Sequence, residues 1–258
     1  MSTGRADMSS RHALVTGASR GIGAAIARRL AADGFSLTIS ARSEATLGET
    51  AAELGASGAE VQSVTGDMAV EEDVRRVARQ HLERFKSLDV LVISAGMAFA
   101  GELERYPLRR LDKQFAVNLR APFALVQECL PMLRRAAAAN PARGAKVVAI
   151  ASISGVVPEP LLAAYGATKA ALISLCQSIT VEESGQGVSA TAISPGYVNT
   201  EMAAWAADRA DPATHVGSAS MMDPGDVAEM VAAVTHLSAR AVAPHIVLTR
   251  PGASLWRA

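Results

Sequence analysis

The chain has 258 residues, 25 basic and 25 acidic side chains, and an apolar fraction of one half. This length fits one large domain or two small ones, with enough apolar residues for a buried core. Balanced charge without a run of one sign excludes the electrostatic footprint of a nucleic-acid or membrane-surface binder and favours a small-molecule partner.

Residues 1–11 are small and polar, so we expect a loose N-terminal tail rather than a signal peptide or an anchor. The longest apolar runs are far shorter than a membrane span. Cys129 and Cys176 lie in apolar helical patterns, which indicates buried free thiols in a reducing compartment. These features together predict a cytoplasmic protein.

From residue 12 onward, short apolar runs alternate with longer helical stretches, which is typical of repeated β-α units. We therefore expect an α/β fold with three layers, a doubly wound parallel sheet covered by helices on both faces. No internal repeat interrupts the series, so residues 12–258 are expected to form a single domain. The predicted strands are 13–16, 35–40, 61–65, 88–93, 146–150, 190–194 and 246–249.

A glycine-rich turn follows the first predicted strand and opens an alanine-rich helix. Glycines here permit a tight turn, close approach of the backbone to a phosphate, and a pyrophosphate seated on the helix N-terminus. The spacing is Gly-x3-Gly-x-Gly and so departs from the commoner Gly-x-Gly-x2-Gly pattern. The turn predicts cofactor contacts from Gly17, Ser19, Arg20, Gly21, Ile22 and Gly23.

The residues after the second predicted strand normally meet the adenosine ribose of a dinucleotide. An acidic residue there would repel a 2′-phosphate, but this chain has Ala41. Arg42 and Arg20 can offer two guanidinium groups to that phosphate, which favours NADP(H) over NAD. The alternative is that both arginines are ordinary surface charges.

Further candidate contacts follow the later strands, where ligands of open α/β sheets bind. Asp67 is placed either to cap the next helix or to contact the adenine amine. The predicted contacts from these positions are Asp67, Met68, Ala95, Gly96, Pro195, Gly196, Val198 and Thr200. Residues 201–222 contain methionine and tryptophan without a sustained period, so they are either a lid over an apolar pocket or a plain surface loop.

A phenol and an ammonium lie four residues apart in a helix-forming segment, at Tyr165 and Lys169, and so share one helix face. Ser152 follows a strand, and the loop after it can fold the serine back toward the tyrosine. Asn118 lies in the middle of a predicted helical region, 107–139, where it is either exposed or needed for its amide. By itself the Tyr-Lys pair would equally fit an ordinary helix with an exposed lysine.

The glycine turn, Asn118, Ser152, Tyr165-x3-Lys169 and Pro195-Gly196 together resemble the short-chain dehydrogenase/reductase family, in its shorter single-domain branch of NADP(H)-dependent, 3-oxoacyl-reductase-like members. The resemblance covers residues 12–252. It implies a Rossmann-like sheet of about seven strands and a nicotinamide cofactor. It also implies a homodimer or homotetramer and the catalytic set Asn118, Ser152, Tyr165 and Lys169, with cofactor contacts from Tyr165 and Lys169.

The expected reaction transfers a hydride between NADP(H) and a hydrophobic or 3-oxoacyl-type ketone. Ser152 and Tyr165 would donate hydrogen bonds to the developing alkoxide, and Tyr165 would supply the proton. Lys169 would favour the phenolate by its charge; from the resemblance, it would also hold the nicotinamide ribose, and Asn118 would anchor a water. The alternatives are a non-catalytic NADP-binding regulator on the same fold and an NAD-dependent alcohol dehydrogenase.

Two stretches depart from the family pattern. Ile93-Ser94 stands where two asparagines are usual, so the contacts that brace the central strand are missing or replaced, and residues 249–257 lack the usual double-glycine ending. The five histidines are scattered without ligand spacing, and we expect no metal.

Overall fold

The computed structural model describes residues 11–202 and 221–252. Seven parallel strands form one sheet in the order β3-β2-β1-β4-β5-β6-β7. The strands are β1 (His12–Thr16), β2 (Ser36–Ala41), β3 (Val61–Thr65), β4 (Val90–Ile93), β5 (Ala145–Ile150), β6 (Val188–Pro195) and β7 (His245–Leu248). The prediction of a doubly wound parallel α/β sheet is confirmed.

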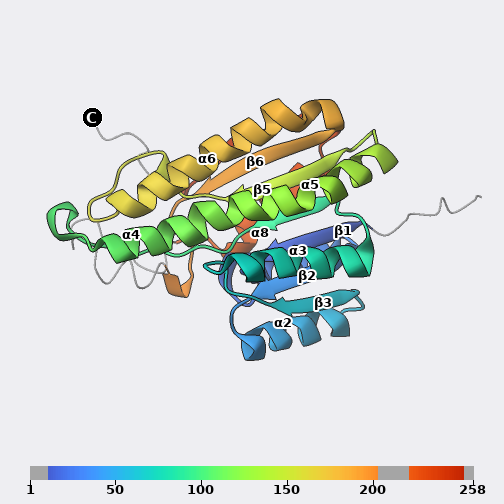
Figure 1. Cartoon of the computed structure of the whole chain (residues 1–258), viewed down its shortest axis with the longest axis horizontal. Coiled ribbons are helices and arrows are strands. Elements are labelled where there is room, and N and C mark those ends of the chain that lie inside the picture. Colours follow the sequence, from blue (N-terminus) through green and yellow to red (C-terminus); the bar gives the residue numbers. More distant parts are fainter. Residues whose placement is uncertain (1–10, 203–220, 253–258) are drawn as a thin grey trace, which may run out of the picture.

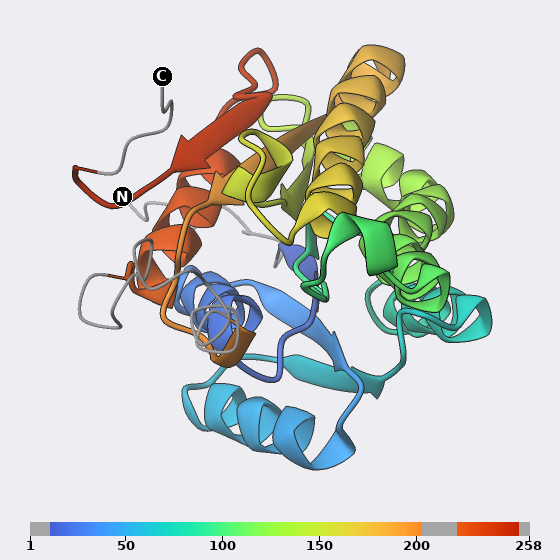
Figure 2. The same cartoon turned by 90° about the vertical axis from the view of Figure 1, so that its left-hand side faces the viewer.

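Helices cover both faces of the sheet, as Figures 1 and 2 show. The longer helices are α1 (Gly21–Ala32), α2 (Glu44–Ala56), α3 (Glu71–Phe85), α4 (Leu108–Phe115), α5 (Ala121–Ala139), α6 (Ala163–Glu183) and α8 (Pro224–His236). The short helical turns are η1 (Leu103–Arg105), η2 (Ala116–Arg120), η3 (Ile153–Gly155) and η4 (Ser184–Gln186).

The alternation of side chains along each strand divides the core into two clusters. Leu14 of β1 packs into the cluster under α3, α5 and α6, whereas its neighbours Ala13 and Val15 pack into the cluster under α1, α2 and α8. Strands β4 and β5 are buried along their whole length, as expected for parallel strands covered on both faces.

The order of the strands reverses between β1 and β4, because β2 and β3 lie to one side of β1 and β4 to β7 to the other. In open α/β sheets, ligands bind in the crevice at the carboxyl ends of the strands at such a point. Here the Thr16 hydroxyl accepts hydrogen bonds from the backbone N–H groups of Ser94 and Ala95, each at 3.2 Å. A threonine side chain of β1 therefore braces this junction, where the family's asparagines are absent.

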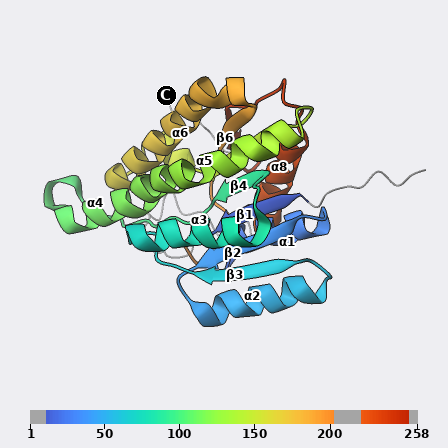
Figure 3. The ribbon, with the colours of Figure 1, turned by 45° about the vertical axis from the view of Figure 1, so that its right-hand side comes forward.

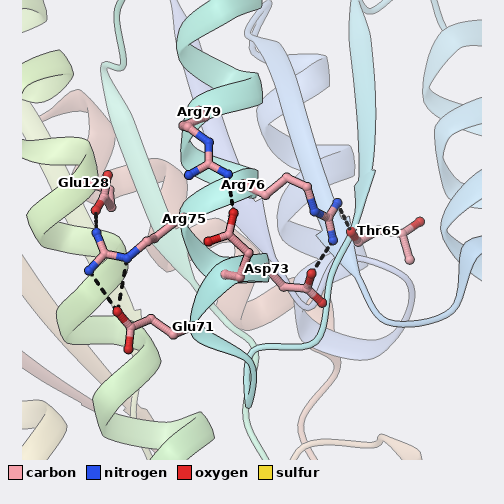
Figure 4. Close-up of polar contacts among 8 residues, drawn as sticks. Thr65, Glu71, Asp73, Arg75, Arg76, Arg79 and Glu128 are labelled. Atoms are coloured by element: carbon pink, nitrogen blue, oxygen red, sulfur yellow. Dashed lines mark hydrogen bonds and ion pairs between the residues drawn. The ribbon is translucent and has the colours of Figure 1, made fainter.

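Polar contacts tie α3 to the neighbouring elements (Figure 4). Arg75 pairs with Glu71 on its own helix and with Glu128 on α5, which lies beside α3 in Figures 1 and 3. Arg76 donates to the backbone carbonyl of Thr65 at 2.8 Å and so joins α3 to β3. These side chains are partly exposed, so each pair is worth about 0–1 kcal/mol. They orient α3 more than they stabilise it.

The structure corrects several predicted details. Strand β4 begins at Val90 rather than at residue 88, and β6 is longer at both ends than predicted. The predicted helical region 107–139 contains one π-helical turn, η2, which carries Asn118. Most of the lid candidate 201–222 and of the tail 1–11 lies outside the described residues.

Cys129 and Cys176 are buried free thiols, as predicted. Within residues 11–202 and 221–252, no helix is both long and apolar enough to cross a membrane. In the same residues, no group of three histidine, cysteine, aspartate or glutamate side chains is placed to hold a metal ion.

Candidate active site

A cavity of about 1090 Å³ lies at the carboxyl ends of the strands and is lined by loops from both halves of the sheet. It is larger than the roughly 300–1,000 Å³ usual for a small-molecule pocket. Most of the predicted site residues line it: Gly17, Arg20, Gly21, Ile22, Gly23, Arg42, Asp67, Met68, Ala95, Gly96, Ser152, Tyr165, Lys169, Pro195, Gly196, Val198 and Thr200. Tertiary structure thus gathers positions that are far apart in the sequence.

The glycine turn is shaped by close backbone approach. Gly17 has a φ of +68°, and a Cβ atom there would lie 2.8 Å from the backbone of Ala95. A Cβ atom on Gly23 would lie only 2.2 Å from the carbonyl oxygen of Gly17. Helix α1, which follows, has no acidic residue in its first turn and no side-chain cap at Arg20. The turn and the helix end therefore fit a phosphate group.

Ser19 differs from its prediction, because it does not line the cavity. Its carbonyl oxygen accepts a hydrogen bond from the Thr50 hydroxyl at 3.4 Å, which ties the turn to α2. Arg20 and Arg42 do line the cavity, and both are exposed. Arg20 forms an ion pair with Glu201 across the cavity mouth.

The prediction that Asp67 caps the next helix is wrong. The N-cap of α3 is Val70, and Asp67 Oδ1 instead accepts from the backbone N–H of Ala69 at 2.9 Å. The backbone N–H of Asp67 donates to Asp73 Oδ2, also at 2.9 Å. Asp67 is thereby fixed inside the loop after β3, on the wall of the cavity.

Tyr165 and Lys169 lie on one face of α6, as the spacing predicts, and the Lys169 Nζ atom is 5.7 Å from the centroid of the Tyr165 ring. Lys169 is buried and donates to the backbone carbonyl of Ile150 at 2.7 Å. Burial lowers the pKa of Lys169 to about 8. The burial of Lys169 excludes the alternative of an ordinary helix with an exposed lysine at this position.

The net effect of the protein's own groups is to raise the pKa of Tyr165, whereas the sequence predicted that Lys169 would favour the phenolate. Burial raises this pKa to about 12, a hydrogen bond with the Ser152 side chain lowers it, and the charge of Glu159 raises it further. The ammonium group of Lys169 donates to the Ile150 carbonyl and lies 5.7 Å from the centre of the Tyr165 ring. The phenol is therefore held in its protonated form at neutral pH, next to Ser152.

Asn118 is fully buried and does not line the cavity. Its Oδ1 atom accepts from the backbone N–H of Met97 at 2.9 Å, and its Nδ2 atom donates to the Met97 carbonyl at 2.8 Å and to Thr168 Oγ1 at 3.0 Å. Thr168 in turn donates to the carbonyl of Tyr165 at 2.7 Å. The side-chain amide thus joins the loop after β4 to the turn of α6 that carries the tyrosine.

A second amide, which the sequence analysis did not single out, acts on the same loop. Gln114 of α4 is fully buried, accepts from the backbone N–H of Phe99 at 3.0 Å, and donates to the Tyr106 hydroxyl at 2.6 Å. Tyr106 closes the ring by donating to the Phe99 carbonyl at 3.1 Å. The only signal in the sequence was a glutamine on the apolar side of a short helix.

A carboxylate on the cavity wall also escaped prediction. Glu159, in the loop between η3 and α6, accepts hydrogen bonds from the hydroxyl groups of Ser154 and Tyr197. The loop-like composition of 154–160 gave no hint that one of its side chains would be fixed at both oxygen atoms.

Residues 11–211 match the family model described as short chain dehydrogenase. The chain belongs to the short-chain dehydrogenase family. This dehydrogenase is 37% identical over 196 residues to the rhamnolipids biosynthesis 3-oxoacyl-(acyl-carrier-protein) reductase of Pseudomonas aeruginosa, covering 76% of this chain and 75% of that one. It is 37% identical over 205 residues to 2-(R)-hydroxypropyl-CoM dehydrogenase of Xanthobacter autotrophicus, covering 78% and 79%.

Solved structures of the family share the fold of this dehydrogenase. A short-chain dehydrogenase from Burkholderia cenocepacia in complex with NADP has a TM-score of 0.79 and 31% identity, over 94% of this chain and 96% of that one. This short-chain dehydrogenase is therefore a Rossmann-like oxidoreductase that acts between CH–OH and C=O groups with a nicotinamide cofactor.

Proposed function

We propose that this short-chain dehydrogenase reduces a ketone to a secondary alcohol with NADPH, and that Ser152, Tyr165 and Lys169 carry the reaction. The observation that supports it most is the partly buried Tyr165 phenol, hydrogen-bonded to Ser152 and one helical turn from Lys169, in a cavity that continues to the glycine turn. A non-catalytic NADP-binding regulator would have no need of a phenol beside a serine hydroxyl in this place.

Tyr165 is the acid of the proposed reaction. The nicotinamide, when bound, supplies the hydride, and the carbonyl oxygen gains negative charge as the hydride adds. Ser152 and Tyr165 donate hydrogen bonds to that oxygen, and Tyr165 passes its proton to it. A phenol with a pKa near 12 stays protonated at neutral pH until an alkoxide, which is a stronger base, forms beside it.

Lys169 and Asn118 support Tyr165 in different ways in this scheme. Lys169 brings a positive charge that favours the phenolate left after proton transfer. Asn118 does not touch the reacting groups and is a positioning residue, because its amide fixes the Met97 loop and, through Thr168, the Tyr165 turn.

The proposed cofactor is NADP(H) rather than NAD(H). Ala41, at the end of β2, brings no negative charge to the ribose end of the cavity, and the exposed guanidinium of Arg42 follows it directly on the cavity wall. Arg20, across the same end, is available as a second partner once its surface pair with Glu201 exchanges. Similar structures solved with NADPH or NADP support this choice.

A hydrophobic or 3-oxoacyl-type ketone is the proposed substrate. Met97, Phe99 and Leu162 give the far end of the cavity an apolar wall. The similarity to a 3-oxoacyl-(acyl-carrier-protein) reductase supports the same class. The alternative, an NAD-dependent alcohol dehydrogenase, requires a cofactor preference opposite to the one that Arg42 favours.

Replacement of the proposed acid tests the reaction. We expect Tyr165→Phe to keep NADPH affinity, measured by fluorescence titration, while kcat for ketone reduction falls by about 10³-fold or more, since the proton source is lost. The matched control is Tyr106→Phe, which removes a phenol that lies outside the cavity lining and should cost far less. Substantial remaining turnover in Tyr165→Phe would rule out this residue as the acid.

Cofactor preference is tested at Arg42. Because Arg42→Asp replaces a cation with an anion beside the 2′-phosphate, we expect the ratio of kcat/KM for NADPH over NADH to fall by about 10²-fold or more. Arg143→Asp, on the α5-β5 connection away from the cavity, serves as the charge-matched control. An unchanged ratio in Arg42→Asp would remove Arg42 from the cofactor site.

We also propose a homodimer or homotetramer that packs through α5 and α6. Phe123 on α5 is 51% exposed and Val181 on α6 is 81% exposed, so both helices present apolar side chains outside the core. Size-exclusion chromatography with light scattering tests this: a mass of a single chain at micromolar concentration would contradict it.

A further inference from the structure

The Glu159 carboxylate is held from two loops that are distant in the sequence. Its Oε2 atom accepts from the hydroxyl of Ser154, and its Oε1 atom accepts from the hydroxyl of Tyr197 at 3.1 Å. Ser154 is buried, and Tyr197 follows strand β6. Since both oxygen atoms have a fixed donor, the carboxylate is held in one orientation, unlike a glutamate side chain that is free in a loop.

Glu159 lies close to the proposed reacting groups. The backbone N–H of Ser154 donates to Ser152 Oγ at 3.2 Å, and the two serine hydroxyl oxygens are 3.3 Å apart. The carboxylate is therefore two hydrogen bonds, or about 6 Å, from Ser152. Glu159, Ser152 and Tyr197 all line the same cavity.

The charge of Glu159 reaches both neighbouring phenols. It raises the pKa of Tyr165, after the larger effect of burial, and it contributes in the same way to the pKa of Tyr197, which is raised to about 12. Hydroxyl donors hold a carboxylate without neutralising it, unlike a lysine or arginine partner. The Glu159 carboxylate thus lines the cavity with two hydroxyl groups as its hydrogen-bond donors.

Other charged side chains of the cavity are distributed unevenly. Those at the glycine turn and the mouth belong to the proposed cofactor end: Arg20, Arg28, Arg42, Asp67, Glu201 and Asp223. At the substrate end, the described lining residues with a charge are Lys169 beside Tyr165, Glu159 and Arg110, and the guanidinium of Arg110 lies 5.5 Å from the centre of the Phe99 ring. Glu159 is the one connected to Ser152.

We propose that Glu159 determines substrate specificity, favouring ketones that carry a cationic or hydrogen-bond-donating group about 6 Å from the carbonyl and rejecting ketones with an anionic group there. The inference rests on the proposed ketone reduction and names the substrate class within it. Glu159 acts on a remote group of the substrate and takes no part in the hydride or proton transfer.

The test uses three acetophenones that differ only in the para substituent, which is methyl, aminomethyl or carboxylate. For each enzyme, kcat/KM with NADPH is normalised to the methyl compound. We expect the ratio of the aminomethyl to the carboxylate compound to fall by about 100-fold in Glu159→Gln, about tenfold from each substrate. Glutamine keeps the size and a carbonyl acceptor for one hydroxyl, so the charge and one of the two acceptor atoms are removed.

Ser154→Ala is the matched control, because it breaks the connection to Ser152 but keeps the carboxylate. We expect it to lower kcat/KM for all three ketones and to keep the ratio of the aminomethyl to the carboxylate compound well above that of Glu159→Gln, because Tyr197 still holds the charged carboxylate. A parallel change of all three in Glu159→Gln would make Glu159 a positioning residue for Ser152 and overturn the proposal. An unchanged ratio in Glu159→Gln would also overturn it.

A binding measurement separates this inference from the proposed reaction. Calorimetric titration of the protein loaded with NADP is performed with the three corresponding secondary alcohols. Affinity in the order aminomethyl, methyl, carboxylate, lost in Glu159→Gln, supports the anionic subsite even if no ketone is reduced. Equal affinities, or no binding by any of the three alcohols, overturn it.

Discussion

Replacement of Asn118 by leucine is the most demanding test of the structure, because the side chain joins two parts of the site without lining it. Leucine has the same branched arrangement of side-chain heavy atoms, so the variant removes the amide and retains the shape of the side chain. The loop after β4 then loses its partner at both the N–H and the carbonyl of Met97, and Thr168 loses the donor that points at it.

The expected cost follows from burial. Asn118 is 0% exposed, so water cannot replace the lost contacts without a rearrangement of the loop. Two backbone groups of Met97 left without a partner cost about 1–3 kcal/mol each, so Asn118→Leu should lower the free energy of unfolding by about 2–6 kcal/mol. Thr168→Val, which removes one acceptor and one donor at the other end of the same connection, should cost about 1 kcal/mol.

Urea unfolding monitored by far-ultraviolet circular dichroism measures the stability of the three proteins, and kcat for ketone reduction is measured on the folded variants. We expect kcat to fall in Asn118→Leu beyond what its unfolded fraction explains, since the Tyr165 turn loses its link to the Met97 loop. A loss of unfolding free energy below about 1 kcal/mol, with kcat unchanged, would refute the assignment of these three hydrogen bonds.

Two further predictions concern the glycine turn and the loss of stability at acid pH. Gly23→Ala should abolish measurable NADPH binding, because its Cβ atom would lie 2.2 Å from the Gly17 carbonyl oxygen. Gly55→Ala in α2, where nothing lies within 4 Å of the new Cβ atom, should stabilise the protein by up to about 1 kcal/mol. Fluorescence titration measures NADPH binding and thermal unfolding measures stability; if both variants bind NADPH equally well, the glycine turn is not the phosphate site. Burial lowers the pKa of His81 to about 4, below the unfolded value of 6.5, so the unfolded chain takes up a proton first as the pH falls. About 3 kcal/mol of stability should therefore be lost between neutrality and pH 4, and urea unfolding across that range should show a shallower loss in His81→Gln; equal slopes would contradict this account.

The sequence specified the elements because their signals are local. Alternating apolar runs and helices, a glycine turn after the first strand and a Tyr-x3-Lys pair need no knowledge of the fold, and they predicted the sheet, the cofactor class and most of the cavity lining. Boundaries shifted by a few residues, as at Val90, since the end of a strand depends on its neighbours in the sheet.

Two predictions from the sequence were wrong because they depended on the packing of the folded chain. The position of Asp67 before a predicted helix made it a reasonable N-cap candidate. Helix α3 begins later, at Glu71, and its N-cap is Val70. The pKa of Tyr165 could not be judged from the nearby lysine, because burial has the largest effect on it. Both depend on distances and exposure, which spacing in the sequence does not contain.

What the sequence determined by itself was the kind of chemistry, since residue types at a strand end or on one helix face follow from local periodicity. Only the tertiary structure decided which groups meet. It brought Asn118 to Thr168 and Glu159 to Tyr197, pairs separated by 50 and 38 positions along the chain. Hydrogen bonds act over about 3 Å, so contacts between distant segments exist only once the sheet has folded them together.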